Sequence, residues 1–299
     1  MTTERRFSQL DVFTATPLRG NPLAVVHDAQ GLSDAQMAEF ARWTNLSETT
    51  FLLPPSEAAA AAGADYRVRI FTPGGELPFA GHPTLGSCFA WLSAGGQPRD
   101  AGTVVQECGV GLVRVRREGT RPASTAGTDR TADTVRLAFA APPLRRSGPA
   151  EDAALRAQVR ASLRLPDEAL LRLQWVDNGP GWLAALLPDA ATVLALRPDF
   201  AAMAGLKLGV VGAHPAGAEC AFEVRAFVPG LGVPEDPVTG SLNAGLAQWL
   251  IDAGLAPAQY VAAQGAALGR AGRVHVQRVG ADTWIGGDTC AVVSGIVAL

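Results

Sequence analysis

An internal repeat constrains the possible fold of this chain more than any other feature of its sequence. Residues 69–74 (RIFTPG) and residues 225–230 (RAFVPG) lie 156 positions apart and share four of their six residues. Each segment is followed by a polar turn and then by apolar residues at a spacing of three to four, which is typical of a helix. Gly20-Asn21-Pro22 and Asn178-Gly179-Pro180 recur at a similar spacing. A repeat of this kind predicts two similar halves.

The pattern around each repeat predicts a strand, a turn and a helix. Polar and apolar residues alternate from Arg67 to Phe71, the period of a half-buried strand, and Pro73-Gly74-Gly75 ends it. The first helix is expected to begin near His82, with Pro83 suited to a first helical position. The second helix is expected over residues 241–253. Strands outnumber helices without a regular βαβ alternation, which favours an α+β fold.

Length and charge limit the number of domains and the class of partner. At 299 residues the chain exceeds the usual size of a single core, so we expect two domains with a boundary at Pro142-Pro143. The net charge of −3 supplies no cationic surface, so nucleic acid is not expected as a partner. No apolar run reaches membrane-spanning length and the N-terminal residues do not resemble a signal peptide. We therefore expect a cytoplasmic protein without membrane contact.

The cysteines do not indicate a metal site. They form no CxxC pair and have no histidine nearby at the spacing of metal ligands. Buried free thiols and no bound metal are therefore expected. The four residues are Cys88, Cys108, Cys220 and Cys290.

Four polar residues stand at turn-to-helix junctions or just before a buried strand: Glu48, His82, Asp236 and Ser241. Taken singly, His82 could cap a helix or fill a core, and Asp and Ser are common helix caps. Taken together, two helix N-termini related by the repeat would direct backbone N–H groups at a shared cleft, where a carboxylate could bind. This arrangement predicts a site for a small acidic molecule.

Glu48 breaks the symmetry between the two halves. In the second half the comparable position is expected to be apolar, either Ala204 or Leu208, depending on the alignment. A carboxylate that is present in only one of two similar halves is consistent with a single proton-transfer group. The alternative is that Glu48 accepts hydrogen bonds from backbone N–H groups of its own turn.

Several short motifs run in order along nearly the whole chain and resemble those of a known family. They are DVFT with GNP at 11–14 and 20–22, NLSET at 45–49, FAGHPT at 79–84, EDPVTGS at 235–241, and QG with GR at 264–265 and 269–270. On these residues the chain resembles the PhzF-like phenazine-biosynthesis isomerases, which share their fold with diaminopimelate epimerase.

The resemblance implies an α+β fold of two β-barrel-like domains, each wrapped around one central helix. A pseudo-twofold axis would relate the domains, and the active site would lie between them. The N-terminal domain would comprise residues 1–142 plus 288–299, because the last strand would return to it, and the C-terminal domain residues 143–287. The resemblance also suggests a homodimer.

The resemblance further implies the reaction. In such enzymes the glutamate that matches Glu48 moves a proton between carbons of a small cyclic, carboxylate-bearing substrate without any cofactor, as in trans-2,3-dihydro-3-hydroxyanthranilate isomerase. Glu48 is expected to act as general acid/base in the interdomain cleft, with His82 and Asp236 as proton-handling or positioning groups. The residues expected to bind the substrate are Asn21, Ser47, Gly81, Thr239, Gly240 and Ser241.

Other functions are compatible with the same fold. A two-base epimerase with a cysteine pair would need a thiol at the start of each central helix, but residues 80–82 (AGH) and 237–239 (PVT) stand there. A pyridoxal-phosphate enzyme is disfavoured because Lys207 is the only lysine and no motif surrounds it. An epimerase or racemase without a cysteine pair, and a non-catalytic protein that binds a metabolite or a protein partner, are the alternatives.

One pair of residues departs from the family pattern. Leu242-Asn243 follows Ser241 where a small residue such as alanine is expected. A larger side chain there is expected to narrow the pocket, which bears on the identity of the substrate more than on the type of reaction.

Overall fold

The chain divides into two compact units in the computed structural model, which describes residues 3–120, 135–231 and 233–299. One unit comprises Met1–Ala140 with Gly286–Leu299, and the other comprises Ala141–Ile285. The expected boundaries after residues 142 and 287 each lie two residues from these limits. Among the described residues, no helix is long and apolar enough to cross a membrane.

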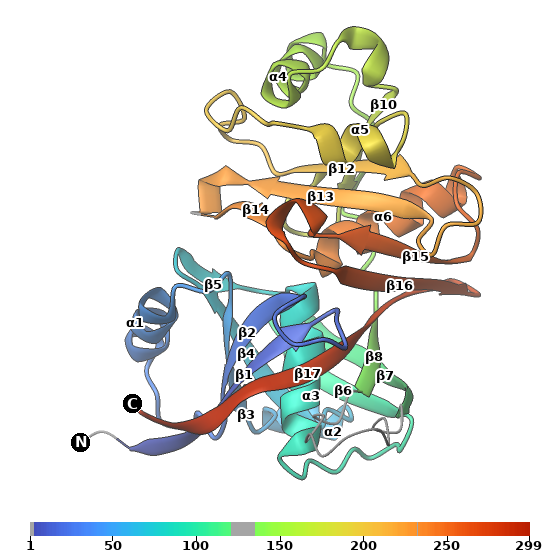
Figure 1. The fold of residues 1–299 in the computed structure, drawn as a ribbon. Coiled ribbons are helices and arrows are strands. Elements are labelled where there is room, and N and C mark those ends of the chain that lie inside the picture. Colours follow the sequence, from blue (N-terminus) through green and yellow to red (C-terminus); the bar gives the residue numbers. More distant parts are fainter. Residues whose placement is uncertain (1–2, 121–134, 232) are drawn as a thin grey trace, which may run out of the picture. The chain divides into compact units, whose positions relative to one another are not determined.

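In the N-terminal unit, eight of the described strands form a closed ring in which each strand pairs with the next (Figure 1). In order around the ring they are β17 (Asp282–Ala298), β1 (Glu4–Val12), β2 (Asn21–Val26), β3 (Thr49–Leu53), β4 (Tyr66–Thr72), β6 (Thr103–Cys108), β7 (Gly111–Thr120) and β8 (Val135–Ala140), which pairs with β17 again. The short β5 (Gly75–Leu77) forms a hairpin with β4.

The helix α3 (Gly81–Ser93) fills this barrel. It contacts β1, β2, β3, β4, β6, β7 and β8, and its first ten residues are all buried. A helix that is buried all round needs apolar or small residues on every face. Gly86 shows how close the packing is, because a Cβ atom there would lie 2.5 Å from the side chain of Leu23 on β2. The helices α1 (Asp34–Thr44) and α2 (Glu57–Ala61) make few or no contacts with α3.

The C-terminal unit repeats this plan around the helix α6 (Gly240–Asp252). Its strands, in order of pairing, are β9 (Arg146–Pro149), β10 (Arg172–Asp177), β11 (Leu183–Leu186), β12 (Leu208–Ala213), β13 (Phe222–Val228), β15 (Gln259–Gln264) and β16 (Gly272–Val279), with β14 (Val233–Asp236) on β13. The remaining helical elements are α4 (Ala153–Leu163), α5 (Ala190–Ala195) and the short 3₁₀ turns Asp167–Ala169, Pro229–Leu231 and Ala266–Leu268.

Strand pairing confirms the predicted duplication. From β1 to β7 the successive pairs are antiparallel, parallel, antiparallel, parallel and antiparallel, and the pairs from β10 to β16 follow the same series. The register agrees as well, because Tyr66 pairs with Gln106 and Phe222 pairs with Ala262, each forty residues on. The predicted α+β fold, with a barrel-like half around each helix, is confirmed.

The predicted helix starts are nearly correct. Both helices begin one residue earlier than expected, at Gly81 and Gly240, and both contain thirteen residues. The predicted strand from Arg67 to Phe71 lies within β4. All four cysteines are free and buried, as expected.

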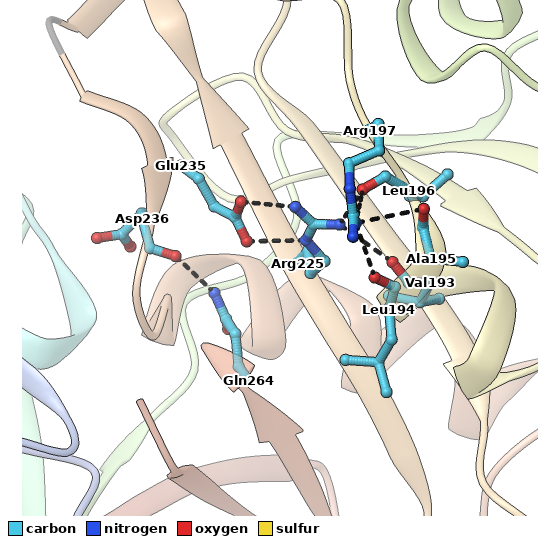
Figure 2. Close-up of polar contacts among 9 residues, drawn as sticks. All are labelled: Val193, Leu194, Ala195, Leu196, Arg197, Arg225, Glu235, Asp236 and Gln264. Atoms are coloured by element: carbon cyan, nitrogen blue, oxygen red, sulfur yellow. Dashed lines mark hydrogen bonds and ion pairs between the residues drawn. The ribbon is translucent and has the colours of Figure 1, made fainter. Parts of the chain in front are cut away.

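Each unit contains a bidentate Arg–Glu pair at matching positions, but the two pairs differ in burial. In the C-terminal unit, Nε and Nη2 of Arg225 donate to the two carboxylate oxygens of Glu235 at 2.9 and 2.8 Å, and both side chains are buried (Figure 2). In the N-terminal unit, Nε and Nη2 of Arg69 donate to the two carboxylate oxygens of Glu76 at 2.7 and 2.6 Å, and Glu76 is 42% exposed. We call each of these bidentate pairs a fork. Each fork joins the two strands of a hairpin that leads into a central helix.

Breaking the two forks should have unequal effects on stability. We expect Arg225→Met to lower the free energy of unfolding by about 3–5 kcal/mol, because it leaves the Glu235 carboxylate buried without its cation. The matched change Arg69→Met should cost about 1 kcal/mol or less, because Glu76 stays in contact with water. Urea unfolding of both variants measures the difference.

A double variant provides the control. Arg225→Met with Glu235→Met removes both charges, so the part of the loss that comes from the unpaired carboxylate should be recovered. The backbone oxygens of Val193 and Leu196 still lose the hydrogen bonds from Nη1 of Arg225. Equal destabilisation by the two single variants would contradict this account of the forks.

Candidate functional site

The predicted site residues fall into two groups, one in each unit. Asn21, Ser47, Glu48, Gly81 and His82 belong to the N-terminal unit. The other group belongs to the C-terminal unit and consists of Asp236, Thr239, Gly240 and Ser241. Each group is gathered at the start of the central helix of its own unit.

Strand direction brings the N-terminal group together. The strands β2 and β3 are parallel neighbours, so both begin at the same end of the barrel. Asn21 is the first residue of β2, and Glu48 directly precedes β3. Before Glu48, the left-handed backbone of Asn45 (φ 53°) ends α1 and turns the chain towards this edge.

A short chain of polar contacts links this group. Nε2 of His82 lies 3.4 Å from Oε2 of Glu48, and Nδ1 of His82 lies 3.2 Å from Nδ2 of Asn21. The hydroxyl of Ser47 donates to Oδ1 of Asn21 at 3.4 Å. When Asn21 donates through Nδ2, the neutral ring of His82 carries its proton on Nε2, the nitrogen that faces Glu48. Ser47 thus contacts Asn21, and Asn21 contacts the His82 ring.

Burial keeps His82 neutral. Its side chain is 4% exposed, and burial lowers the pKa of the imidazole to about 3, an effect that the backbone of Pro22 offsets only in part. The contact between Glu48 and His82 therefore joins a carboxyl group to a neutral ring at ordinary pH. Such a ring can donate a hydrogen bond to the carboxylate without adding a positive charge.

The N-cap residues of the two central helices do not cap them through their own side chains. The N-cap residues are Ala80 and Thr239, and neither makes a side-chain cap bond. His82 and Ser241 are both the second residue of their helices, so neither is a cap. The backbone N–H groups of the first turns point out of the helix end, where the helix dipole favours an anion.

The C-terminal group is held by Gln264, a residue that the sequence analysis did not assign to the site. Its amide donates to the backbone oxygen of Asp236 at 3.1 Å and to Oγ1 of Thr239 at 2.9 Å, and its oxygen accepts from the backbone N–H of Thr239 at 3.0 Å (Figure 2 shows the Asp236 contact). Oγ1 of Thr239 donates in turn to Oδ2 of Asp236 at 2.5 Å. The motif Gln264-Gly265 was the available signal, because a buried glutamine must be hydrogen-bonded.

Ser241 is held from the loop that follows β10. Nε1 of Trp182 donates to the Ser241 hydroxyl oxygen at 2.9 Å, and Nδ2 of Asn178 donates to the Ser241 backbone oxygen at 2.8 Å. The hydroxyl accepts from Trp182 and so retains its own proton for donation.

The residue that matches Glu48 in the C-terminal unit is Lys207. Thr49 pairs with Phe71 and Leu208 pairs with Phe227, and the repeat matches these two phenylalanines. The expectation of an apolar counterpart, Ala204 or Leu208, is therefore wrong. The segment from Leu208 to Phe227 is three residues shorter than the one from Thr49 to Phe71. A constant spacing of 156 residues therefore aligns Glu48 with the wrong residue. A carboxylate still occupies this position in only one unit.

Leu242 and Asn243 are accommodated within the C-terminal unit. A Cβ atom on Gly209 of β12 would lie 2.3 Å from Cδ1 of Leu242, so the absence of a side chain at Gly209 makes room for the leucine. Nδ2 of Asn243 donates to the Thr239 backbone oxygen and to Oε1 of Gln264, both at 2.9 Å. Both side chains are fully buried.

The described residues contain no group of three or more His, Cys, Asp or Glu side chains placed to hold a metal ion. The groups available at the two helix starts include carboxyl groups, a neutral imidazole, hydroxyls and backbone N–H donors.

The lowered pKa of His82 predicts a pH dependence of stability. The unfolded chain binds this proton near the ordinary pKa of 6.5 and the folded chain only near 3, so the contribution of His82 to stability is lost as the pH falls below 6.5. His82→Gln should remove this loss, which approaches about 1.4 kcal/mol per pH unit in the window. Urea unfolding of both proteins between pH 4 and pH 8 measures it. Parallel curves for the two proteins would contradict the assignment.

Comparison with known proteins places the chain in a family. The family model described as "Phenazine biosynthesis-like protein" matches residues 10–295. A trans-2,3-dihydro-3-hydroxyanthranilate isomerase from Pseudomonas aeruginosa is 34% identical over 279 residues, which cover 92% of this chain and 91% of that protein. "Antisense-enhancing sequence 1" from Schizosaccharomyces pombe is 38% identical over 247 residues, which cover 80% of this chain and 78% of that protein.

Solved structures agree with this result. The structure of a predicted epimerase from Pseudomonas aeruginosa matches with a TM-score of 0.74 and 27% identity, over 98% of this chain and 99% of that one. The chain therefore belongs to the phenazine biosynthesis-like family, and it is an isomerase of the PhzF type.

Proposed function

We propose that this isomerase moves a proton between two carbons of a small cyclic substrate that bears a carboxylate, without a cofactor. Its substrate would be trans-2,3-dihydro-3-hydroxyanthranilate or a compound of the same class, since that is the substrate in the name of the Pseudomonas aeruginosa relative. Glu48 would act as the general acid/base.

The contact between Glu48 and a neutral His82 at the start of α3 supports this proposal most strongly. The two side chains approach to 3.4 Å, and Glu48 is 15% exposed, so it is partly shielded but reachable. Burial keeps His82 uncharged. The neutral ring can orient the Glu48 carboxylate, whereas a positively charged ring would also stabilise that carboxylate electrostatically. A carboxylate in this setting can both accept and return a proton.

The proposed step conserves all atoms and electrons. The Glu48 carboxylate takes a proton from one ring carbon, and the electron pair of that C–H bond moves into the ring and shifts a double bond. The protonated carboxyl then delivers a proton to a second carbon, which restores the carboxylate. The product is an isomer of the substrate, so the reaction needs no oxidant, reductant or group donor.

The other predicted site residues would position the substrate. The N–H of Gly81 at the start of α3 in the N-terminal unit, and the N–H of Gly240 with the Ser241 hydroxyl at the start of α6 in the C-terminal unit, are each suited to bind a carboxylate. Asp236 would handle a second proton or a polar substituent, in a position fixed by Thr239 and Gln264. Asn21 and Ser47 would act through the ring of His82.

Removal of the proton-transfer group tests the proposal. We expect Glu48→Gln to lower kcat for trans-2,3-dihydro-3-hydroxyanthranilate by about 10²–10⁴-fold, because general acid/base catalysis contributes that much. The matched control is Glu57→Gln on α2, an exposed glutamate in the same unit, which should leave kcat unchanged. Conversion is followed by chromatography of substrate and product. Equal rates for the two variants would refute the role of Glu48.

We also propose a homodimer, as the family resemblance suggests. Two large apolar side chains of the N-terminal unit support it, since Trp43 on α1 is 79% exposed and Ile296 on β17 is 67% exposed. Light scattering after size exclusion should give twice the chain mass of 31.0 kDa. A monomer mass at micromolar concentration would contradict the proposal.

A further inference from the structure

Lys207 is the only lysine of the chain, and it occupies the position that matches the proton-transfer glutamate. It directly precedes β12, as Glu48 directly precedes β3. The second residue of the central helix is His82 in one unit and Ser241 in the other. Since Glu48 and His82 approach to 3.4 Å, the equivalent positions Lys207 and Ser241 belong to the same end of the C-terminal unit.

The contacts of Lys207 connect it to the start of α6. Its Nζ donates to the backbone oxygen of Pro180 at 2.6 Å. The same loop holds Ser241 through Trp182 at 2.9 Å and through Asn178 at 2.8 Å. One loop therefore contacts both the ammonium group and the first turn of the helix.

Among the described residues, the ammonium group of Lys207 pairs with no carboxylate. Its side chain is half-buried, and no carboxylate of the residues that the structure describes lies within 4.0 Å of it. An ammonium group has three donors, and the Pro180 oxygen uses one. The same loop contains a second unused group, because Oδ1 of the buried Asn178 has no hydrogen-bond partner in the described part of the chain. A partly desolvated cation without a counter-ion costs free energy that a bound anion would recover.

We propose that Lys207 binds the carboxylate of a small-molecule ligand, together with the Ser241 hydroxyl and the first N–H groups of α6, all of which belong to the C-terminal unit. This inference rests on the proposed function for the identity of the substrate. The matched position would then carry opposite charges in the two units: the carboxylate of Glu48 in the N-terminal unit and the anion-binding ammonium group of Lys207 in the C-terminal unit. The class of ligand is a small carboxylate, and Oδ1 of Asn178 would accept a hydrogen bond from an amino or hydroxyl group beside it.

A single lysine makes a direct measurement possible. Reductive methylation with ¹³C-formaldehyde keeps the positive charge and places one side-chain reporter in the protein, apart from the N-terminal amine. The probe ligands are 3-hydroxyanthranilate, an aromatic compound that cannot isomerise, and 2-aminophenol, which lacks the carboxylate. We expect the Lys207 resonance to shift saturably with 3-hydroxyanthranilate and to stay in place with 2-aminophenol.

Calorimetry on two variants separates charge from structure. Lys207→Gln can still donate to the Pro180 oxygen but has no charge, and it should weaken binding of 3-hydroxyanthranilate at least tenfold. Lys207→Arg keeps the charge and should stay within about threefold of the wild type, as expected for a charge-assisted contact. Wild-type affinity in Lys207→Gln, an unmoved Lys207 resonance, or no binding of 3-hydroxyanthranilate would each overturn the inference.

The outcomes also separate this inference from the proposed function. Glu48-dependent turnover by a protein whose Lys207 resonance does not move would overturn the role of Lys207 and leave the isomerase mechanism standing. A carboxylate-specific shift in a protein without Glu48-dependent turnover would establish the anion site and refute the mechanism.

Discussion

The close packing of a buried helix inside each barrel-like unit is the constraint on which the rest of the structure depends. A helix can fill such a ring only if its residues suit contact on every side, and Gly86 and Gly245 sit where a Cβ atom would lie within 2.5 Å of a neighbouring strand. This packing fixes where each helix begins. The first turn of each helix therefore presents its N–H groups at one defined end of its unit, beside the starts of two parallel strands.

The chemistry of each unit depends on the residue that directly precedes its second parallel strand, Glu48 before β3 and Lys207 before β12. Burial that comes from the same packing keeps His82 neutral beside Glu48. In the other unit the matching strand start carries Lys207, and Asp236 is held by Gln264 and by the hairpin that the Arg225–Glu235 fork closes. The two units thus have similar folds, but the matched positions 48 and 207 carry opposite charges.

Much of this could be predicted from the sequence, because repeats and helix patterns are local signals. The duplicated halves, the helix starts and the asymmetry of Glu48 were all visible there. The counterpart of Glu48 was predicted wrongly because the spacing between halves changes from 159 residues at Lys207 to 156 at Arg225. Gln264 could not be assigned a role either, since its partners Asp236 and Thr239 lie more than twenty residues away along the chain.

We propose that one carboxylate, present in only one of the two similar halves, both removes and returns the proton. NMR of trans-2,3-dihydro-3-hydroxyanthranilate in D₂O with the wild-type protein tests it most directly, because the spectra report double-bond migration and the isotope at each ring carbon. We expect a shifted double bond, with the receiving carbon carrying either the transferred proton or a deuteron that the Glu48 carboxyl has exchanged with D₂O, and with no deuterium at any other ring carbon. An unchanged substrate, or deuterium at other carbons without migration of the double bond, would contradict it.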